Sequence, residues 1–194
     1  SYYALAVRFR AAAMGVPYLP VRSMLGTDTG KASGAATITC PYTGLPLLAL
    51  PALYPDVAAI HVHEADIYGN ARLRGTSVAD LDLARAAKKL ILTCERLIPH
   101  EEFRREPDRT SIPFYCVDAV CEVPFGSYPG NMPYEYFSDE EHLKLWLKKE
   151  ENLAEYEAFL TEAIWNQPDF HSYLLWAGGL PRLQQLRRQE YLID

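Results

Sequence analysis

Short apolar runs with few polar interruptions mark the first part of the chain. Residues 57–63 are nearly continuous in apolar side chains, as in a strand covered on both faces. Residues 90–94 read as another buried strand and residues 117–123 as a third strand. Helical sequence at 79–89 separates the first two runs, and a short helix opening at Glu101 precedes the third. The order strand, helix, strand, helix, strand predicts an α/β fold with an open, mostly parallel sheet and flanking helices.

A different set of elements precedes these strands. The Ala- and Leu-rich segment 3–14 predicts a helix that stops at Gly15. Residues 17–21 read as a short extended segment, and residues 22–33 as a loop rich in Gly, Thr and Ser. Segments 37–40 and 47–50 flank a Pro-Tyr-Thr-Gly turn, which predicts a β-hairpin.

From Ser138 onwards the pattern becomes helical. Ser138 as N-cap and Glu141 three positions later form a capping box, and helices are predicted over 139–148, 153–165 and 180–191. A Pro-, Gly- and Tyr-rich segment, 124–133, precedes this helical region. We predict a single domain over residues 1–194, in which residues 138–194 form a helical tail of the same domain.

We also expect this domain to be incomplete at its N-terminal side. The chain does not start with Met, and the predicted helix at 3–14 has an uncapped start at Ser1.

Composition narrows the functional classes. The chain is 49% hydrophobic and 23% charged, as in ordinary globular proteins, and its net charge of −6 argues against a nucleic-acid binder. No apolar run approaches the ~20 residues that a membrane span needs, and the first residues read as a helix, so we expect no signal peptide. The four cysteines form no CxxC pair, so we expect reduced, mostly buried thiols. These features predict a cytoplasmic protein without nucleic-acid or membrane partners.

One candidate metal site lies at the end of the first predicted strand. Side chains alternate along a strand, so His61 and His63 share a face, and Asp66 follows closely. Two imidazoles and a carboxylate could hold a metal ion, but polar residues at the edge of a sheet are the favoured explanation. No further ligand is identifiable by spacing, and we predict no metal.

A candidate substrate loop follows the first extended segment. It brings together a guanidinium, two hydroxyls and glycines in Arg22, Ser23, Gly26, Thr27 and Asp28. Such a loop can present a bidentate cation and backbone N–H groups to a carboxylate or phosphate. The alternative is a surface loop in which the glycines only make turns.

Gly69 and Asn70 form a second, weaker candidate. They come shortly after a predicted parallel strand, and ligands of open α/β sheets bind beyond the carboxyl ends of strands. A tight turn that needs a positive φ explains the same two residues.

An ordered set of segments resembles the A (alpha) chain of family I coenzyme A transferases, of the glutaconate type. The matching stretches include VPYLPVRSMLGTD at 16–28, TCPYTG at 39–44, YGN at 68–70 and VDAV at 117–120. The resemblance covers approximately residues 1–175. The alpha chains of the family begin with a glycine-rich strand–turn region that this chain lacks, which agrees with an incomplete domain.

The resemblance implies a reaction that moves CoA from an acyl-CoA to another carboxylate. A glutamate of the partner beta subunit becomes a glutamyl thioester, so no catalytic residue is expected in this chain. Its partners would be the missing N-terminal segment and the B (beta) subunit, in a hetero-oligomer. The CoA thioester is a substrate, and no bound cofactor is expected.

In the same resemblance this chain positions the substrate. Arg22 would pair with the distal carboxylate of a dicarboxylic acyl group, and Ser23 with the turn at Gly26, Thr27 and Asp28 would shape the pocket. Tyr2, at the start of the first helix, falls close to the active site. Gly69 and Asn70 remain weaker candidates.

Three other functions stay open. Similar two-subunit scaffolds decarboxylate CoA esters or hydrolyse their carbon–carbon bonds. The ring-opening hydrolases resemble proteins with an acidic residue near the position of Tyr2, and the tyrosine here argues against that activity. The chain could also be a non-catalytic structural subunit.

Overall fold

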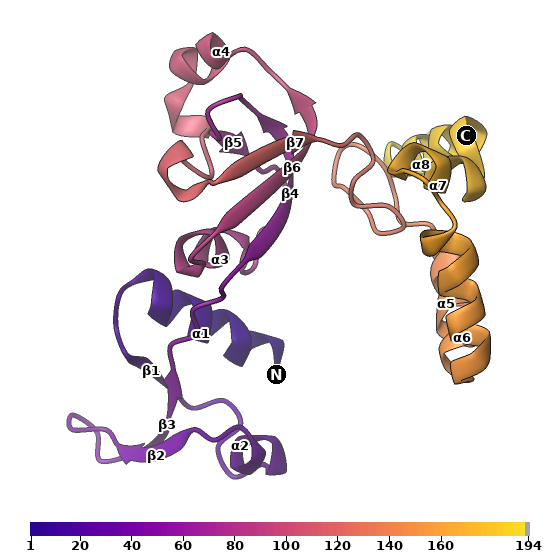
Figure 1. Ribbon diagram of the computed structural model, residues 1–194. Helices are drawn as coiled ribbons and strands as arrows, with labels where there is room; N and C mark the ends of the chain where they lie inside the picture. Colours follow the sequence, from indigo (N-terminus) through magenta and orange to yellow (C-terminus); the bar gives the residue numbers. More distant parts are fainter. Residues whose placement is uncertain (193–194) are drawn as a thin grey trace. The chain divides into compact units, whose positions relative to one another are not determined.

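The computed structural model describes residues 1–192, and the chain divides into two compact units at Pro124 and Phe125 (Figure 1). The division falls at the start of the Pro-, Gly- and Tyr-rich segment that the sequence singled out. That the two units form a single domain stays a prediction.

The first unit contains the predicted, mostly parallel sheet. Strands β4 (Ala58–Ala65), β6 (Leu90–Leu97) and β7 (Ala119–Glu122) are parallel, and β5 (Ala71–Arg72) pairs antiparallel with β4, in the order β5-β4-β6-β7. The predicted α/β fold class is therefore confirmed. The short helix predicted near Glu101 is α4 (His100–Arg105).

The two faces of this sheet differ in cover. Ile60, Leu92 and their neighbours are buried in a core that also takes in Ala84 of α3 (Asp80–Ala86). On the opposite face Ala59, Ile91 and Ala119 lie side by side in register and are exposed. Successive residues of a strand point to opposite faces of the sheet. Because α3 packs on one face only, the side chains on that face are buried and those of Ala59, Ile91 and Ala119 are exposed.

A second, antiparallel sheet lies in the same unit. Strands β1 (Tyr18–Val21), β3 (Pro46–Pro51) and β2 (Ala36–Thr39) pair in the order β1-β3-β2, and the predicted hairpin is confirmed as β2 and β3. Helix α1 (Tyr2–Ala13) shares a small core with this sheet through Ala4, Val7, Val21, Leu48 and Leu50.

Two expectations about local structure in this region were wrong. Helix α1 does have an N-cap, because the Ser1 hydroxyl accepts a hydrogen bond from the Ala4 N–H at 3.3 Å. The segment predicted as a loop contains a short helix, α2 (Asp28–Ala32), capped by the Thr27 side chain.

The second unit is helical, as predicted. It contains α5 (Glu140–Glu150), α6 (Leu153–Leu160) with a π-helical turn at Thr161–Trp165, α7 (Phe170–Trp176) and α8 (Gly179–Glu190). Helix α7 was not predicted. The predicted cap of α5 was wrong by one residue, since the Asp139 carboxylate, not the Ser138 hydroxyl, accepts from the His142 N–H at 3.1 Å.

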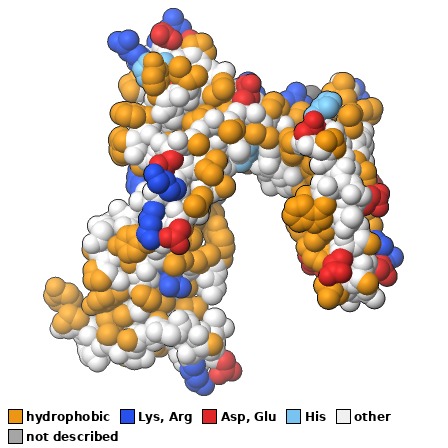
Figure 2. Space-filling model, viewed as in Figure 1, with side chains coloured by type: hydrophobic (Ala, Val, Ile, Leu, Met, Phe, Trp, Pro, Cys, Tyr) orange, Lys and Arg blue, Asp and Glu red, His pale blue; other side chains and the backbone are white. Residues whose placement is uncertain are grey.

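Apolar side chains remain on the surface of the second unit. Figure 2 shows them over the region of α5 and α6, where Leu147 and Leu153 are 64% and 72% exposed. Among residues 1–192, no helix reaches the length and apolarity that crossing a bilayer requires.

Candidate functional site

A cavity of about 280 Å³ lies in the first unit between α1, the loop after β1, and β3. Its lining includes Ala4, Leu5 and Arg8 of α1, Met24 of the loop, and Leu50 and Pro51 of β3. Thr29 and Ala32 of α2, together with Ser33, complete the wall on the loop side. The cavity thus joins the two regions that the sequence put forward, the start of the first helix and the loop after Val21.

The loop is held in one shape by contacts within itself. The Thr27 hydroxyl donates to the Met24 carbonyl at 2.8 Å and accepts from the Gly30 N–H at 3.1 Å. Gly30 is buried, and a Cβ there would stand 2.2 Å from the Met24 carbonyl oxygen. Met24 itself has a φ of 64°, and Gly26 turns the chain at 75°. Thr27 and Gly26 therefore shape the backbone of the loop, and their role in a substrate pocket stays a prediction.

The remaining predicted residues of this region lie around the cavity but do not line it. The Arg22 side chain is exposed and makes no ion pair with another described residue. The Ser23 hydroxyl is buried without a hydrogen-bond partner among residues 1–192, whereas Asp28 pairs with Lys31 at 3.0 Å. Tyr2, at the start of α1, is 62% exposed.

Gly69 and Asn70 lie elsewhere, in a turn between β4 and β5. The Asn70 backbone N–H and side-chain amide both donate to Asp66, at 2.9 and 2.8 Å, and the His100 Nδ1 is 2.7 Å from the same carboxylate. Gly69 has a φ of 100°, and a Cβ there would meet the Val117 Cβ at 2.8 Å. The safer interpretation of these residues, a tight turn, accounts for both of them.

This turn sits far from the cavity within the first unit. Figure 1 places β5 and α4 at one end of the unit and α2 at the other. Burial raises the pKa of the Asp66 carboxyl, but hydrogen bonds from His100 and Asn70 outweigh it, so the pKa lies below its usual range. Asp66 is thus an ionised anchor of the turn.

The two histidines of β4 take part in separate contacts. His61 Nδ1 is 2.8 Å from the Thr93 hydroxyl and Nε2 is 2.8 Å from Glu95, while His63 accepts from the Arg74 N–H at 3.0 Å. No group of three His, Cys, Asp or Glu side chains within residues 1–192 is arranged to hold a metal ion.

The glutamates at the strand ends are bound by their own chain. Glu64 pairs with Arg72 at 3.3 Å, Glu95 contacts His61, and Glu122 accepts from the Leu97 N–H at 2.8 Å. A carboxylate held by such partners is a poor nucleophile, because it would have to leave them to reach a thioester.

Cys94 and Cys116 offer no activated thiolate. Burial raises the pKa of Cys94 to about 11 and raises that of Cys116. A thiol with a raised pKa is protonated at neutral pH and reacts slowly. All four cysteines are free, and Cys121 is exposed, in contrast to the expectation of mostly buried thiols.

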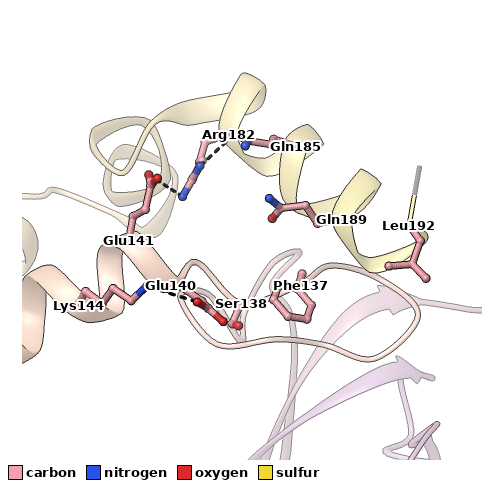
Figure 3. A pocket seen from close by; sticks show the side chains of 9 residues that line it. All are labelled: Phe137, Ser138, Glu140, Glu141, Lys144, Arg182, Gln185, Gln189 and Leu192. Atoms are coloured by element: carbon pink, nitrogen blue, oxygen red, sulfur yellow. Dashed lines mark hydrogen bonds and ion pairs between the residues drawn. The ribbon is translucent and has the colours of Figure 1, made fainter. Parts of the chain in front are cut away.

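A larger cavity, of about 640 Å³, lies in the second unit (Figure 3). Arg182 on its wall donates to Asp139 at 2.6 Å, to Glu141 at 3.1 Å and to Gln185 at 2.9 Å. Lys144 is 3.6 Å from Glu140. The cations of this cavity are therefore neutralised by neighbouring side chains, which leaves little charge for an anionic substrate.

Sequence reasoning missed Arg8 and Thr29 as lining residues of the smaller cavity. The spacing of Ala4 and Arg8, four residues apart on one helix, places them on the same face and could have indicated a shared wall. The packing of that helix face against β3 could not be predicted from the sequence.

Residues 3–123 of the chain match the family described as Coenzyme A transferase. The chain belongs to this family. It is 34% identical over 205 residues to the alpha (A) chain of glutaconate CoA-transferase from Acidaminococcus fermentans, a match that covers 96% of this chain and 64% of that relative. It is 31% identical over 174 residues to the alpha (A) chain of 3-oxoadipate CoA-transferase from Pseudomonas knackmussii, covering 89% of this chain and 61% of that relative.

A crystal structure supports the same family. Glutaconate coenzyme A-transferase from Acidaminococcus fermentans superposes with a TM-score of 0.86 at 33% identity, over 94% of this chain and 62% of that one. The resemblance to the glutaconate type and the fold that it implied are thereby confirmed. This member of the coenzyme A transferase family spans less than two thirds of the length of these relatives.

Proposed function

We propose that this chain is the alpha subunit of a heteromeric, cytoplasmic CoA transferase that moves CoA between an acyl-CoA and a carboxylate. The observation that carries the proposal is the similarity to the alpha chain of a glutaconate CoA-transferase over 96% of this chain. Because both relatives named above are transferase subunits, transfer is favoured over decarboxylation, carbon–carbon hydrolysis and a purely structural role.

The partners follow from this assignment. The complex contains a beta subunit, together with the part of the alpha chain that the relatives have beyond the matched region, since the match covers 64% and 61% of their lengths. The substrates are a CoA thioester and a free carboxylate, and the reaction needs no further cofactor.

The chemistry is covalent catalysis by a glutamate of the beta subunit. Its carboxylate attacks the thioester carbonyl and displaces the CoA thiolate, which leaves a mixed anhydride. The thiolate then attacks the glutamyl carbonyl and releases the first acyl group as a carboxylate, and the second carboxylate reverses these steps. The pairing of Glu64, Glu95 and Glu122 within this chain supports a nucleophile supplied by the partner.

This chain contributes the substrate-positioning side of the site. Arg22 pairs with the distal carboxylate of a dicarboxylic acyl group, and its exposed, unpaired guanidinium supports that role. Ser23 offers a buried hydroxyl without a partner among the described residues. The turn at Gly26, Thr27 and Asp28 holds both side chains in place, and Tyr2 closes the site from α1. Gly69 and Asn70 do not contact the substrate and contribute only by forming the turn between β4 and β5.

Trapping the intermediate tests the mechanism. The purified complex is incubated with an acyl-CoA and reduced with borohydride, and each polypeptide is examined by peptide mass spectrometry. Reduction of a glutamyl thioester should modify only the beta subunit. A modified glutamate in this chain would overturn the proposed division of roles.

The substitution Arg22→Ala tests substrate positioning. Loss of a charge-paired contact should reduce kcat/KM for a dicarboxylate by about 2–4 kcal/mol of transition-state stabilisation, with little change for a monocarboxylate. Arg104→Ala, an exposed arginine of α4 away from the loop, is the matched control. An equal loss with both substrates would contradict the role of Arg22.

A further inference from the structure

Arg8 lies in the wall of the small cavity with most of its hydrogen-bonding capacity unused. Its Nε donates to the Pro51 carbonyl at 3.0 Å, and its own carbonyl accepts from the Leu53 N–H at 3.1 Å. The first bond ties the Arg8 side chain to the end of β3, and the second ties its backbone to the residues that follow this strand. An arginine has five N–H donors, so the four on its terminal nitrogens remain for another partner.

The surroundings of Arg8 favour an anionic partner. None of the described residues that line the cavity is acidic, and no carboxylate of residues 1–192 pairs with Arg8. The Thr29 hydroxyl also borders the space. Arg8 is the one charged side chain among the described residues that line the cavity, and such a cation attracts a negative group.

The rest of the wall is apolar and the space is small. Ala4, Leu5 and Leu50 present hydrocarbon, and the volume of about 280 Å³ lies just below the range of pockets for drug-sized ligands, about 300–1,000 Å³. A whole CoA thioester does not fit, whereas a short acyl chain does. Apolar sides with a cation at one point match a short chain that ends in a second carboxylate.

We propose that Arg8 binds the distal carboxylate of a short dicarboxylic acyl group through its two terminal nitrogens. Arg8 lines the cavity and Arg22 does not, so the Arg8→Gln and Arg22→Ala variants decide which of the two arginines holds this carboxylate. A planar guanidinium suits this role because it grips both carboxylate oxygens at once. This inference rests on the proposed function for the identity of the substrate, although the anion site itself does not.

The experiment compares glutarate with pentanoate, which have the same chain length and differ in the second carboxylate. Binding of each to the purified complex is measured by titration calorimetry, and each is also assayed as CoA acceptor. Arg8→Gln should weaken glutarate binding by roughly 10- to 100-fold, as expected for a lost hydrogen bond to a charged group, and leave pentanoate unchanged. Arg8→Lys keeps the positive charge but cannot donate two parallel hydrogen bonds, so its affinity for glutarate should lie between those of the wild type and Arg8→Gln.

The matched control is Arg10→Gln on the same helix. Arg10 pairs with Asp82 of α3 at 3.0 Å and does not line the cavity, so the preference for glutarate should stay at the wild-type value. A folded Arg8→Gln complex that retains the full preference overturns the proposal.

A second variant covers the case in which Arg8→Gln does not fold. Ala32 is an exposed residue of α2 on the opposite wall, and Ala32→Asp places a carboxylate facing the same space. Glutarate binding should weaken and pentanoate binding should not, and unchanged glutarate binding overturns the proposal. Failure of the proposed function looks different: the wild-type complex would exchange CoA with no acceptor, while the Arg8 dependence of glutarate binding could still be measured.

Discussion

The cavities at Arg8 and at Arg182 use the same side chain in opposite ways. Arg182 in the second unit donates to Asp139, Glu141 and Gln185, so its donors are largely occupied within the chain. Among residues 1–192, Arg8 in the first unit donates only from Nε, to the Pro51 carbonyl. The larger of the two cavities therefore has the smaller capacity to bind an anion. Whether the arginine is paired within the chain, and not the volume of the cavity, distinguishes a stabilising cluster from a binding site.

The cluster around Arg182 has the properties of a stabilising network. Asp139 is buried and also accepts from the Tyr128 hydroxyl at 2.9 Å and from the His142 N–H. Burial is the main cause that raises the pKa of Tyr128 and lowers that of His142, which keeps both neutral. A buried network in which each member has a partner fixes one arrangement of the segments that carry it.

Removing the centre of this network should have the largest effect on stability. Asp139→Ala leaves Arg182 half-paired in a largely buried position, and breaking such a pair costs about 3–5 kcal/mol. Chemical unfolding of the complex, followed by circular dichroism, measures the loss. Glu141→Ala, at an 84% exposed side chain that also contacts Arg182, is the control and should change little. Similar losses for the two variants would mean that Asp139 is not the centre.

A glycine in the other region gives the next largest effect. Gly30→Ala would place a Cβ 2.2 Å from the Met24 carbonyl oxygen, so the loop must shift. Overpacking of this kind costs about 1–3 kcal/mol, and the displaced loop should also reduce kcat/KM for the transferase. Gly34→Ala meets nothing within 4 Å, although its φ is also positive, and should cost stability without the loss of activity. If both variants retain full activity, the loop does not border the substrate site.

Acid should weaken the second unit through Asp139. Its pKa is lowered in the folded protein, chiefly by the hydrogen bond from Arg182, so its contribution is complete above the unfolded pKa of about 4. Below that pH the unfolded chain binds the proton first, and stability should decline by up to about 1.4 kcal/mol per pH unit from this group. Unfolding measured from pH 6 to pH 3 should show a shallower decline for Asp139→Asn. An identical pH dependence would contradict this linkage.

The smallest effect is expected on the rim of the larger cavity. Lys144 and Glu140 are mostly exposed at 76% and 58%, and surface pairs of this kind stabilise little. Lys144→Ala should leave both the melting temperature and KM near their wild-type values. A clear rise in KM for the carboxylate would move the substrate site to this cavity and reverse the comparison.

Local patterns in the sequence predicted most of the first unit. Continuous apolar runs located β4 and β6, and the turn at residues 41–44 located the hairpin of β2 and β3. The short helix α2 was hidden because its residues Asp28–Ala32 lie in a segment rich in Gly, Thr and Ser. Its cap, the Thr27 hydroxyl, also donates to the Met24 carbonyl, a contact that the sequence pattern did not reveal.

Contacts between distant residues account for what the sequence did not show. Asp139 replaces Ser138 as the cap of α5, in a position where it also binds Arg182, 43 residues further along. Arg8 becomes a cavity residue only because α1 packs on β3, where Pro51 fixes it. The composition of the loop containing Arg22 indicated a candidate site, whereas nothing in the sequence distinguished Arg8 from other arginines in helices.

The close approach of Gly30 to the Met24 carbonyl has a consequence for how the proposed substrate site could change during evolution. On the loop side, the backbone at Gly30 leaves no space for a side chain. Most substitutions there would displace the whole loop, so the shape of this wall cannot change in small steps. The α1 wall presents Ala4 and Leu5 from a regular helix, where a side chain can grow or shrink without altering the backbone path. Divergence in acyl-chain length, in nature or in directed evolution, should therefore accumulate on the helix and spare the loop.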